Sequence, residues 1–406
     1  MLQRLGRNVI GLGAVSLFTD VSTEMIYPLL PVFLAGVLGT SSTFIGAIEG
    51  VAETTASLLK LVSGWWSDRM RSRKPFVVIG YLIASVARPF TAATRNAAQV
   101  LAIRVTDRIG KGLRTSPRDA LLADSAPPDA RGLAYGFHAA ADNAGAVLGP
   151  LIAFLVLKLH GVGMLETGKR LSTHDEFAIR NVFWLSAIPA AIAMLVLIFV
   201  VRDVPHREAK SESSMASLDV ERLSGRFWAY LTVVLLFTLG NSTDAFLLLR
   251  ANQLGVPVAL APILWAVLNF VKSATGTYGG ELSDRLGRKP LIVGGWLLYA
   301  AVYFAFAWAG APWQAWALFA IYGIFYGMTE GTEKALVADI VARSRRGAAF
   351  GWYNLAIGLG ALPASLIFGW IWDNYGAPSA FVFGASLALL AAILMAIVAP
   401  SRQNAS

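Results

Sequence analysis

Residues 64–75 read GWWSDRMRSRKP, and residues 280–290 read GELSDRLGRKP. In both stretches a glycine is followed four positions later by Asp-Arg, then by a basic cluster and a proline, and both stretches lie between long apolar segments. Gly64 and Gly280 are 216 residues apart in a chain of 406 residues. A repeat at this spacing indicates two homologous halves, each with its own copy of a charged turn at a membrane surface.

The composition is that of an integral membrane protein. Hydrophobic residues make up 56% of the chain and charged residues 15%, whereas a soluble domain carries about 25% charged residues. The sequence has no cysteine, which excludes disulfides and thiolate metal sites. The net charge of +9 resides mostly in short loops between apolar segments, where it sets membrane orientation, so we expect no nucleic-acid partner.

Twelve segments are long and apolar enough to be spanning helices, which need roughly 20 residues each. The polar stretch 202–226 separates six from six and predicts an N-terminal bundle (1–201), a linker (202–226) and a C-terminal bundle (227–406). The predicted spans are residues 8–36, 44–66, 75–94, 98–123, 132–159, 178–201, 227–250, 256–279, 290–309, 313–341, 347–372 and 378–399.

The loop charges predict the orientation. The loops after spans two, eight and ten hold ten basic residues between them in short stretches, whereas the loops near 37–43, 251–256, 310–312 and 373–377 hold none. Because basic loops stay in the cytoplasm, we expect a multi-pass protein of the bacterial inner membrane with both termini cytoplasmic. The loop at 160–177, with Lys169 and Arg170, is the exception.

The halves also match away from the charged turns. Ser22-Thr23-Glu24 parallels Ser242-Thr243-Asp244 at a shift of 220, and the stretch 120–124 (ALLAD) parallels 335–339 (ALVAD) at a shift of 215. An even number of spans returns the chain to its starting side, so the halves run in the same direction.

Twelve spans as six plus six, a long central loop and the doubled G-x-x-x-D-R cluster resemble the major facilitator superfamily. The resemblance implies an all-α fold of twelve transmembrane helices, as two six-helix bundles related by pseudo-two-fold symmetry. It further implies secondary transport of a small-molecule substrate by alternating access, with the proton gradient as the driving force and no cofactor; we expect a monomer in the lipid bilayer.

In this family the repeated cluster latches the two halves on the cytoplasmic side. The latch residues are Gly64, Asp68, Arg69, Gly280, Asp284 and Arg285. The second copy fits the family pattern, whereas Arg71-Ser72 lengthens the first copy by one residue. Because the other motifs gather in the first half, we predict that Asp68→Asn impairs transport more than Asp284→Asn.

A glycine motif in span five points to export. Gly145-x-x-x-Gly149-Pro150 permits close helix packing, and it resembles the G-x-x-x-G-P segment of the family's export-type antiporters. Ordinary helix packing is the other interpretation.

Charged side chains inside the spans are costly and are functional candidates. Span four carries several at helical spacing, so that they share one face, which must line a water-filled cavity or pair with another helix. The candidates on span four are Arg104, Asp107, Arg108, Lys111 and Arg114; those on other spans are Asp20, Glu24, Tyr27, Glu49, Glu53, His138, Asp142, Asp244, Glu330 and Glu333.

The family resemblance implies that spans one, four, seven and ten line a central cavity. Six residues are then expected to converge there: Asp20, Glu24, Arg104, Arg108, Asp244 and Glu330. We hypothesise that Glu24 or Asp20 carries the coupling proton; a permanent ion pair with a span-four arginine is the alternative. For His138, the simpler interpretation is a packing residue whose hydrogen bonds are satisfied inside the protein.

These features predict a secondary transporter and not an enzyme. The sequence has no G-x-x-x-x-G-K-[ST] phosphate loop, which argues against an ATP-driven pump. It also has no nucleophile and base at a spacing that would bring them together, which argues against an enzyme. The basic face favours an anionic or zwitterionic solute, the carboxylates favour a cation, and both together favour an amphipathic one. Proton-coupled export by antiport is the leading function, symport of an organic anion or metal chelate is its alternative, and a membrane sensor is the alternative of another class. No His-rich tract supports a metal site.

Overall fold

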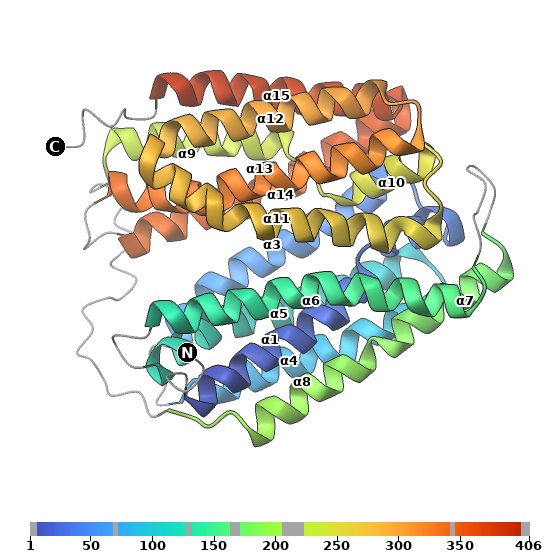
Figure 1. Cartoon of the computed structure of the whole chain (residues 1–406), viewed down its shortest axis with the longest axis horizontal. Helices are drawn as coiled ribbons and strands as arrows, with labels where there is room; N and C mark the ends of the chain where they lie inside the picture. The colour runs from blue at the N-terminus through green and yellow to red at the C-terminus, as the bar shows by residue number, and fades with distance from the viewer. Residues whose placement is uncertain are drawn as a thin grey trace. The chain divides into compact units, whose positions relative to one another are not determined.

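The computed structural model describes residues 6–67, 72–126, 131–162, 171–204, 223–341 and 346–398, and every regular element within these ranges is a helix. In this part of the chain, nine helical segments are long and apolar enough to cross a membrane. Three further helices, α3 (Ser42–Ser67), α5 (Ala97–Ser125) and α13 (Pro312–Ile340), have the length but are more polar. Figure 1 shows the elements in chain order.

The helices of the first half follow the predicted spans to within a few residues at most ends. Besides α3 and α5 they are α1 (Arg7–Ile26), α2 (Leu30–Val32), the π-helical turn η2 (Phe33–Val37), α4 (Lys74–Ala87), the 3₁₀ turn η3 (Arg88–Ala93), α6 (Arg131–Leu159), α7 (Thr173–Leu185) and α8 (Ala187–Phe199).

The second half repeats the pattern. Besides α13 it contains α9 (Gly225–Gly240), α10 (Ala245–Gln253), the 3₁₀ turn η7 (Val258–Leu260), α11 (Ala261–Leu286), α12 (Arg288–Trp308), α14 (Arg346–Tyr375) and α15 (Ala377–Val398).

Four predicted spans are interrupted where the sequence analysis expected continuous helices. Span one breaks near Pro28 and Pro31, span three changes to a 3₁₀ turn at Arg88-Pro89, and span six breaks at Ser186, three residues before Pro189. Proline removes a backbone donor and collides with the preceding turn, which explains these breaks. Span seven breaks after Gly240 at Asn-Ser-Thr-Asp, whose short polar side chains compete for backbone hydrogen bonds. This last break places Asp244 at the start of α10.

The chain divides into two compact units. The first contains Met1–Thr40, Thr55–Ser214 and Pro257–Ala266; the second contains Ser41–Thr54, Met215–Val256 and Val267–Ser406. The beginnings of α3 and α11, the second helical spans of the two halves, therefore each group with the other half's unit. Most of the predicted linker, residues 205–222, lies outside the described residues.

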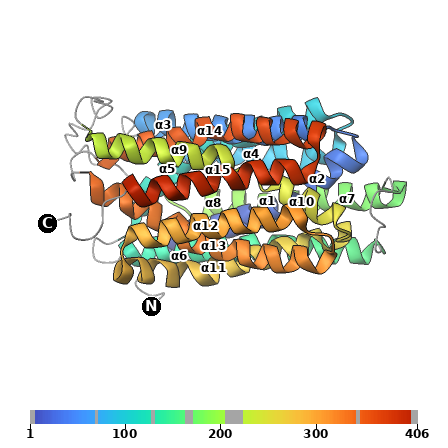
Figure 2. The same cartoon turned by 90° about the horizontal axis from the view of Figure 1, so that it is seen from above.

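Within the first unit, α1 packs against α6 and α8, and α4 packs along α5. A cluster of buried apolar side chains, including Val9, Leu12, Val77, Tyr81 and Leu121, joins α1, α4 and α5. Within the second unit, α12 packs along α15 and α13, and α9 packs on α15 and α14; Figure 2 shows α12 running beside α15. In the first unit, these packings bring the polar faces of α1 and α5 to a shared cavity.

Candidate functional site

A cavity of about 260 Å³ lies in the first unit and gathers most of its walls from α1 and α5. Its size is just below the roughly 300–1,000 Å³ of ordinary ligand pockets, which suits a small solute. The lining residues are Asp20, Thr23, Glu24 and Tyr27 from α1, Arg88 from η3, Asp107, Arg108, Lys111 and Arg114 from α5, and Trp265 from α11.

The charged face of α5 contributes Asp107, Arg108, Lys111 and Arg114 to the cavity wall, and Arg104 is not among the lining residues. Residues three and four apart share one side of a helix, so a run of such charges forms a stripe. Arg104, Asp107, Arg108 and Arg114 are buried, and Lys111 is half-buried. The stripe begins two turns into the helix, after Asn96 accepts a hydrogen bond from the Gln99 amide at 3.0 Å and caps the N-terminus.

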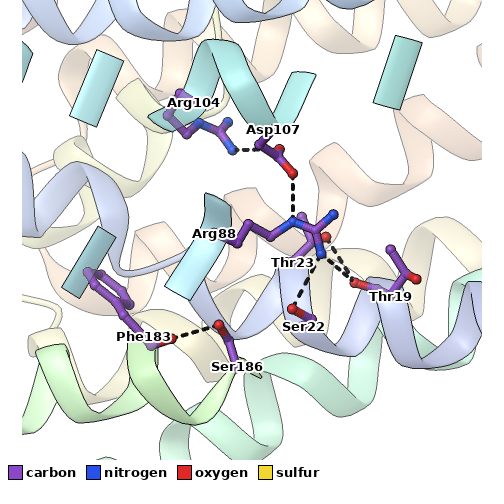
Figure 3. A network of polar contacts seen from close by, with 8 residues as sticks. All are labelled: Thr19, Ser22, Thr23, Arg88, Arg104, Asp107, Phe183 and Ser186. Carbon is purple, nitrogen blue, oxygen red and sulfur yellow. Dashed lines mark hydrogen bonds and ion pairs between the residues drawn. The ribbon is translucent and has the colours of Figure 1, made fainter. Parts of the chain in front are cut away.

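The one carboxylate of this stripe that lines the cavity is neutralised by a buried arginine. Arg88 Nε donates to Asp107 at 2.7 Å, and both side chains are almost fully buried. Arg88 also donates to Thr19 O and Ser22 Oγ at 3.3 Å each, and Arg104 approaches Asp107 to 3.9 Å (Figure 3). Arg88 therefore joins α1, η3 and α5, and Asp107 is satisfied within the protein.

Besides Arg88 and Asp107, the cavity wall contains three cations from α5 and two carboxylates from α1. The cations are Arg108, Lys111 and Arg114, and the carboxylates are Asp20 and Glu24. Asp20 lies within electrostatic range of Lys111 and of Glu24. The site therefore offers both signs of charge to a solute.

Glu24 is held by an aromatic residue from a distant part of the chain. The Trp265 indole N–H donates to Glu24 Oε2 at 2.6 Å, and the ring of Trp265 lies 4.9 Å from that of Tyr27 between centroids. The Arg104 guanidinium carbon is 5.8 Å from the Tyr27 centroid. Two aromatic rings thus form an apolar wall beside the carboxylate.

The glycine motif of α6 lies directly behind the two carboxylates. A Cβ added to Gly145 would stand 2.6 Å from Leu17 O and 2.8 Å from Asp20 Cβ, and one added to Gly149 would stand 2.7 Å from Val21 O and 2.9 Å from Glu24 Cβ. Only glycine permits this approach to the α1 backbone. Pro150 follows inside α6. The motif therefore sets where the carboxylate-bearing turn of α1 sits.

Arg114 offers an unused hydrogen-bond donor. Its side chain is buried and its guanidinium carbon lies 4.4 Å from the Tyr81 centroid. Its Nη1 atom is buried without a hydrogen-bond acceptor in the part of the chain that the structure describes. A buried donor of this kind is costly unless a ligand or water accepts from it.

Four candidates from spans two and five do not line the cavity. His138 and Asp142 lie 3.6 Å apart on α6, and Asp142 also accepts a hydrogen bond from the Ser16 hydroxyl, which ties α6 to α1. Glu49 and Glu53 belong to the first part of α3, which groups with the second unit.

The second-unit candidates have their own partners. Asp244 accepts hydrogen bonds from the hydroxyls of Tyr322 at 2.8 Å and Tyr326 at 2.9 Å. Glu330 pairs with Lys272 at 2.9 Å and Lys334 at 3.6 Å, and Glu333 accepts from Trp296 and Tyr353 at 2.8 and 2.7 Å. That Asp244 and Glu330 share a cavity with Asp20 and Glu24 stays a prediction.

The charged turns are described in part. Asp68 and Arg69 lie outside the described residues, and a Cβ on Gly64 would stand 3.3 Å from Ser116 Cβ. In the second copy, Gly280 is exposed, Asp284 pairs with Arg288 at 2.5 Å and Arg285 pairs with Glu281 at 2.5 Å. The latch role stays a prediction.

Both turns share an ion pair that the sequence analysis missed. Arg288 bonds Asp339 on α13 at 3.1 Å, and Arg73 bonds Asp124 on α5. The arginines are 215 residues apart, and so are the aspartates. The sequence signal was present, because both acids end the repeated A-L-x-A-D segments, but their partners were not assigned.

Sequence reasoning also missed three lining residues: Thr23, Arg88 and Trp265. Arg88 was detectable as a charge inside a predicted span. Trp265 left no signal, because one tryptophan in an apolar span is ordinary. In the described ranges, no group of three or more His, Asp or Glu side chains could hold a metal ion.

The comparisons with known proteins agree with this architecture. The Major Facilitator Superfamily model matches residues 12–332 and, in a second match, 251–406. An uncharacterised MFS-type transporter of Methanocaldococcus jannaschii is 29% identical over 403 residues, covering 98% of this chain and 96% of its own.

More distant matches extend across the chain as well. A multi-drug resistance efflux pump PmrA homolog of Lactococcus lactis is 22% identical, with 94% of this chain and 92% of its own covered. The crystal structure of the nucleoside transporter NupG superposes with a TM-score of 0.78 at 13% identity, covering 96% of this chain and 99% of that one, and this shows the shared fold.

Proposed function

The chain belongs to the major facilitator superfamily and has its twelve-helix fold, and we propose that it exports a small charged or amphipathic solute in exchange for protons. It is a transporter of a small molecule across a membrane and not an enzyme. The proton gradient is its proposed driving force, without a cofactor, and its proposed place is the inner membrane of a bacterium, as a monomer with both termini in the cytoplasm.

One observation carries the proposal: two carboxylates of α1 face three cations of α5 across a small cavity. A carboxylate in such a place is a proton carrier, because its proton affinity follows the charges and the water around it. When alternating access changes those surroundings, Asp20 or Glu24 takes a proton on one side and releases it on the other.

Antiport imposes a further requirement on this site. The proton and the solute must exclude one another, so that each release permits the other binding. Two carboxylates on adjacent turns of one helix, beside a cavity that accepts a solute, meet this requirement because protonation removes the charge that would hold a cationic group.

Two observations favour export. The close packing of Gly145 and Gly149 on α1 places the G-x-x-x-G-P segment behind the proposed proton carriers, and the Lactococcus lactis relative is named as an efflux pump, at 22% identity.

Symport of an organic anion is the second candidate, and the cations of α5 favour it. In that mechanism protonation of Asp20 or Glu24 would strengthen anion binding, because it raises the positive charge of the cavity. The direction of the proton movement therefore separates the two candidates.

The test is reconstitution into proteoliposomes that contain a pH-sensitive dye, with the membrane potential clamped by valinomycin and potassium. Organic cations, anions and zwitterions are added outside one at a time. Antiport predicts that an accepted solute makes the lumen more alkaline; acidification indicates symport. A membrane sensor would move neither protons nor solute, and that outcome would sink the proposal.

A further inference from the structure

The proposed proton carrier Asp20 has a second carboxylate beside it on the neighbouring helix, outside the cavity. We infer that Asp142 on α6 takes the proton from Asp20, with the Ser16 hydroxyl as the bridge, and releases it toward the side of the membrane at which α1 begins. The solute and the proton then use different routes through the first unit. This inference rests on the proposed proton coupling and adds the residue that releases the proton.

The positions of these three side chains follow from the packing of α6 along α1 (Figure 1). Gly145 approaches the α1 backbone beside Asp20. About one turn before Gly145, Asp142 accepts a hydrogen bond from the Ser16 hydroxyl, and Ser16 itself lies one turn before Asp20. Side chains four residues apart on a helix are neighbours, with about 5–6 Å between their Cβ atoms. The hydroxyl therefore lies next to both carboxylates, which are within electrostatic range of each other.

A serine hydroxyl can relay a proton because it donates one hydrogen bond and accepts two. Ser16 donates to Asp142, so its lone pairs can accept from a protonated Asp20, directly or through one water. The proton of Asp20 then moves to Ser16 while the proton of Ser16 moves to Asp142. Asp20 regains its negative charge, Asp142 becomes neutral, and the hydroxyl is restored, so that one proton has moved and nothing else is consumed.

Asp142 can exchange this proton with water that does not pass through the cavity. Its side chain is 34% exposed, and it is not among the residues that line the cavity, whereas Asp20 is. Because a carboxylate that faces lipid is costly, we expect this exposed part to meet water. Asp142 and Ser16 both lie nearer than Asp20 to the end at which α1 and α6 begin, which is the proposed cytoplasmic end. The relay thus leads in the direction that proton-driven export requires.

The charges around Asp142 come from three helices. On α6 itself, Nδ1 of the buried His138 lies 3.6 Å from the Asp142 carboxylate. Arg118 and Asp119 of α5 and Asp20 of α1 lie within electrostatic range of this pair. Arg118 compensates the negative charge that Asp142 regains when its proton leaves, so the site can return to its starting state for the next cycle.

The second half of the chain argues against a purely structural role for this polar contact. The positions equivalent to Ser16, Asp20 and Asp142 are occupied there by Leu236, Gly240 and Ile357. The corresponding helices α9 and α14 nevertheless pack against each other. The repeated scaffold therefore does not need a hydroxyl and a carboxylate at this helix contact, and the half that has them is the half with the proposed proton carriers.

The test measures how quickly Asp20 gains a proton, and it needs no solute. Purified protein in lipid nanodiscs receives a light-triggered pH drop from a caged proton, and time-resolved infrared spectroscopy follows the C=O stretch of protonated carboxyl groups. The band of Asp20 is the one that Asp20→Asn removes. Because a relay works in both directions, Asp142→Asn and Ser16→Ala are each expected to slow the appearance of this band at least about tenfold.

The two variants support each other. Ser16→Ala keeps both carboxylates, so it tests the bridge even if Asp142→Asn does not fold. Glu176→Gln on α7 is the matched control, because Glu176 is 35% exposed and also pairs with a basic side chain of its own helix. This control is expected to keep the wild-type rate. Wild-type rates in both relay variants would overturn the inference, because the proton would then reach Asp20 through the cavity.

Chemical rescue separates proton transfer from packing. Formate is expected to restore the rate in Asp142→Ala, where it can take the place of the missing carboxylate. It is expected to leave Ser16→Ala slow, because the bridge is still absent. A purely structural role of Asp142 would give no response to formate, and a weak acid that enters through the cavity would accelerate both variants equally. Either result contradicts the relay.

The failures of the two proposals are distinguishable. If solutes drive proton movement in proteoliposomes but the relay variants do not slow the protonation of Asp20, antiport stands and the relay is wrong. The same holds if no Asp20 band appears, since Glu24 is then the carrier. If the relay variants slow Asp20 as expected but no solute drives proton movement, the relay stands and the proposed antiport is wrong.

Discussion

The fourth spans of the two halves, α5 and α13, stand in corresponding positions but carry different chemistry. At the 215-residue shift, Asp107 and Lys111 on α5 correspond to Tyr322 and Tyr326 on α13. The charged pair lines a cavity, whereas both tyrosines donate to Asp244.

The first spans, in contrast, keep the same chemistry in both halves. Glu24 and Asp244 occupy equivalent places in the repeated Ser-Thr-acid segment, and each accepts hydrogen bonds from aromatic side chains. The duplicated scaffold thus retains an acid on its first span in both halves. In the first half this acid lines a cavity together with three cations of α5, whereas Asp244 accepts hydrogen bonds from two tyrosines of α13. The proposed proton carriers therefore belong to the first half.

The sharpest way to break this comparison is to neutralise the two kinds of acid. We expect the double variant Asp20→Asn/Glu24→Gln to lose solute-driven proton movement in proteoliposomes, because no carboxylate remains on the cavity wall to carry the proton. Asp244→Asn is expected to keep it, since the proposed proton carriers are untouched and the amide oxygen still accepts from one of the two tyrosines. Unchanged proton coupling in the double variant, or its loss in Asp244→Asn alone, would reverse the assignment.

The next largest effect concerns how each unit satisfies a buried carboxylate. Arg88→Met removes the cation that bonds the buried Asp107 carboxylate at 2.7 Å and is expected to cost about 3–5 kcal/mol. Tyr322→Phe removes one of two donors to Asp244 and is expected to cost about 1 kcal/mol. Intrinsic tryptophan fluorescence during heating in detergent measures both.

A compensating variant separates charge from packing in this test. Arg88→Met/Asp107→Asn removes both charges together, so it is expected to recover most of the stability lost in Arg88→Met. If the double variant is as unstable as the single one, packing by the arginine stem explains the loss and the ion-pair argument fails.

The glycines of spans five and eleven give a third contrast. Gly149 faces the backbone oxygen of Val21, whereas Gly360, at the position equivalent to Gly145, faces the side chain of Thr238 at 2.8 Å from an added Cβ. Because backbone cannot give way as a side chain can, Gly149→Ala is expected to cost about 1–3 kcal/mol and Gly360→Ala less. The residue of the second half that corresponds to Gly149 is already an alanine, the buried Ala364.

Transport in proteoliposomes supplies the second measurement for these glycines. Gly149→Ala is expected to lower solute-driven proton movement more than its stability loss explains, because it displaces the turn that carries Glu24. Equal effects of Gly149→Ala and Gly360→Ala on both measurements would show that the motif serves packing alone.

The sequence predicted the fold well because its signals are local or repeated. Apolar length located all twelve spans, and the doubled turn identified the halves. The breaks at Ser186 and Asn241 were missed, since single prolines and short polar runs are also tolerated inside spanning helices.

The candidate site was predictable only for residues whose periodicity revealed them. Asp20, Glu24, Lys111 and Arg114 stood out as charges in spans, and they line the cavity. Trp265 is more than 200 residues away from its partner Glu24 in the sequence. No local sequence pattern reports such a contact. The packing of Gly149 against the carboxylate-bearing turn of α1 likewise depends on tertiary structure.

The smallest expected effect sharpens the comparison at the charged turns. The pair of Arg73 with Asp124 is mostly buried, with 7% and 28% of the side chains exposed, whereas the pair of Arg288 with Asp339 has 26% and 51% exposed. Water screens the second pair more strongly, so Arg288→Gln is expected to cost less than about 1 kcal/mol and Arg73→Gln somewhat more. Unfolding midpoints at low and high salt measure this: the Arg288→Gln effect should shrink in salt and the Arg73→Gln effect should persist. An equal salt response would mean that burial does not separate the two turns, and that the halves differ in the chemistry of their fourth spans but not in how their charged turns are held.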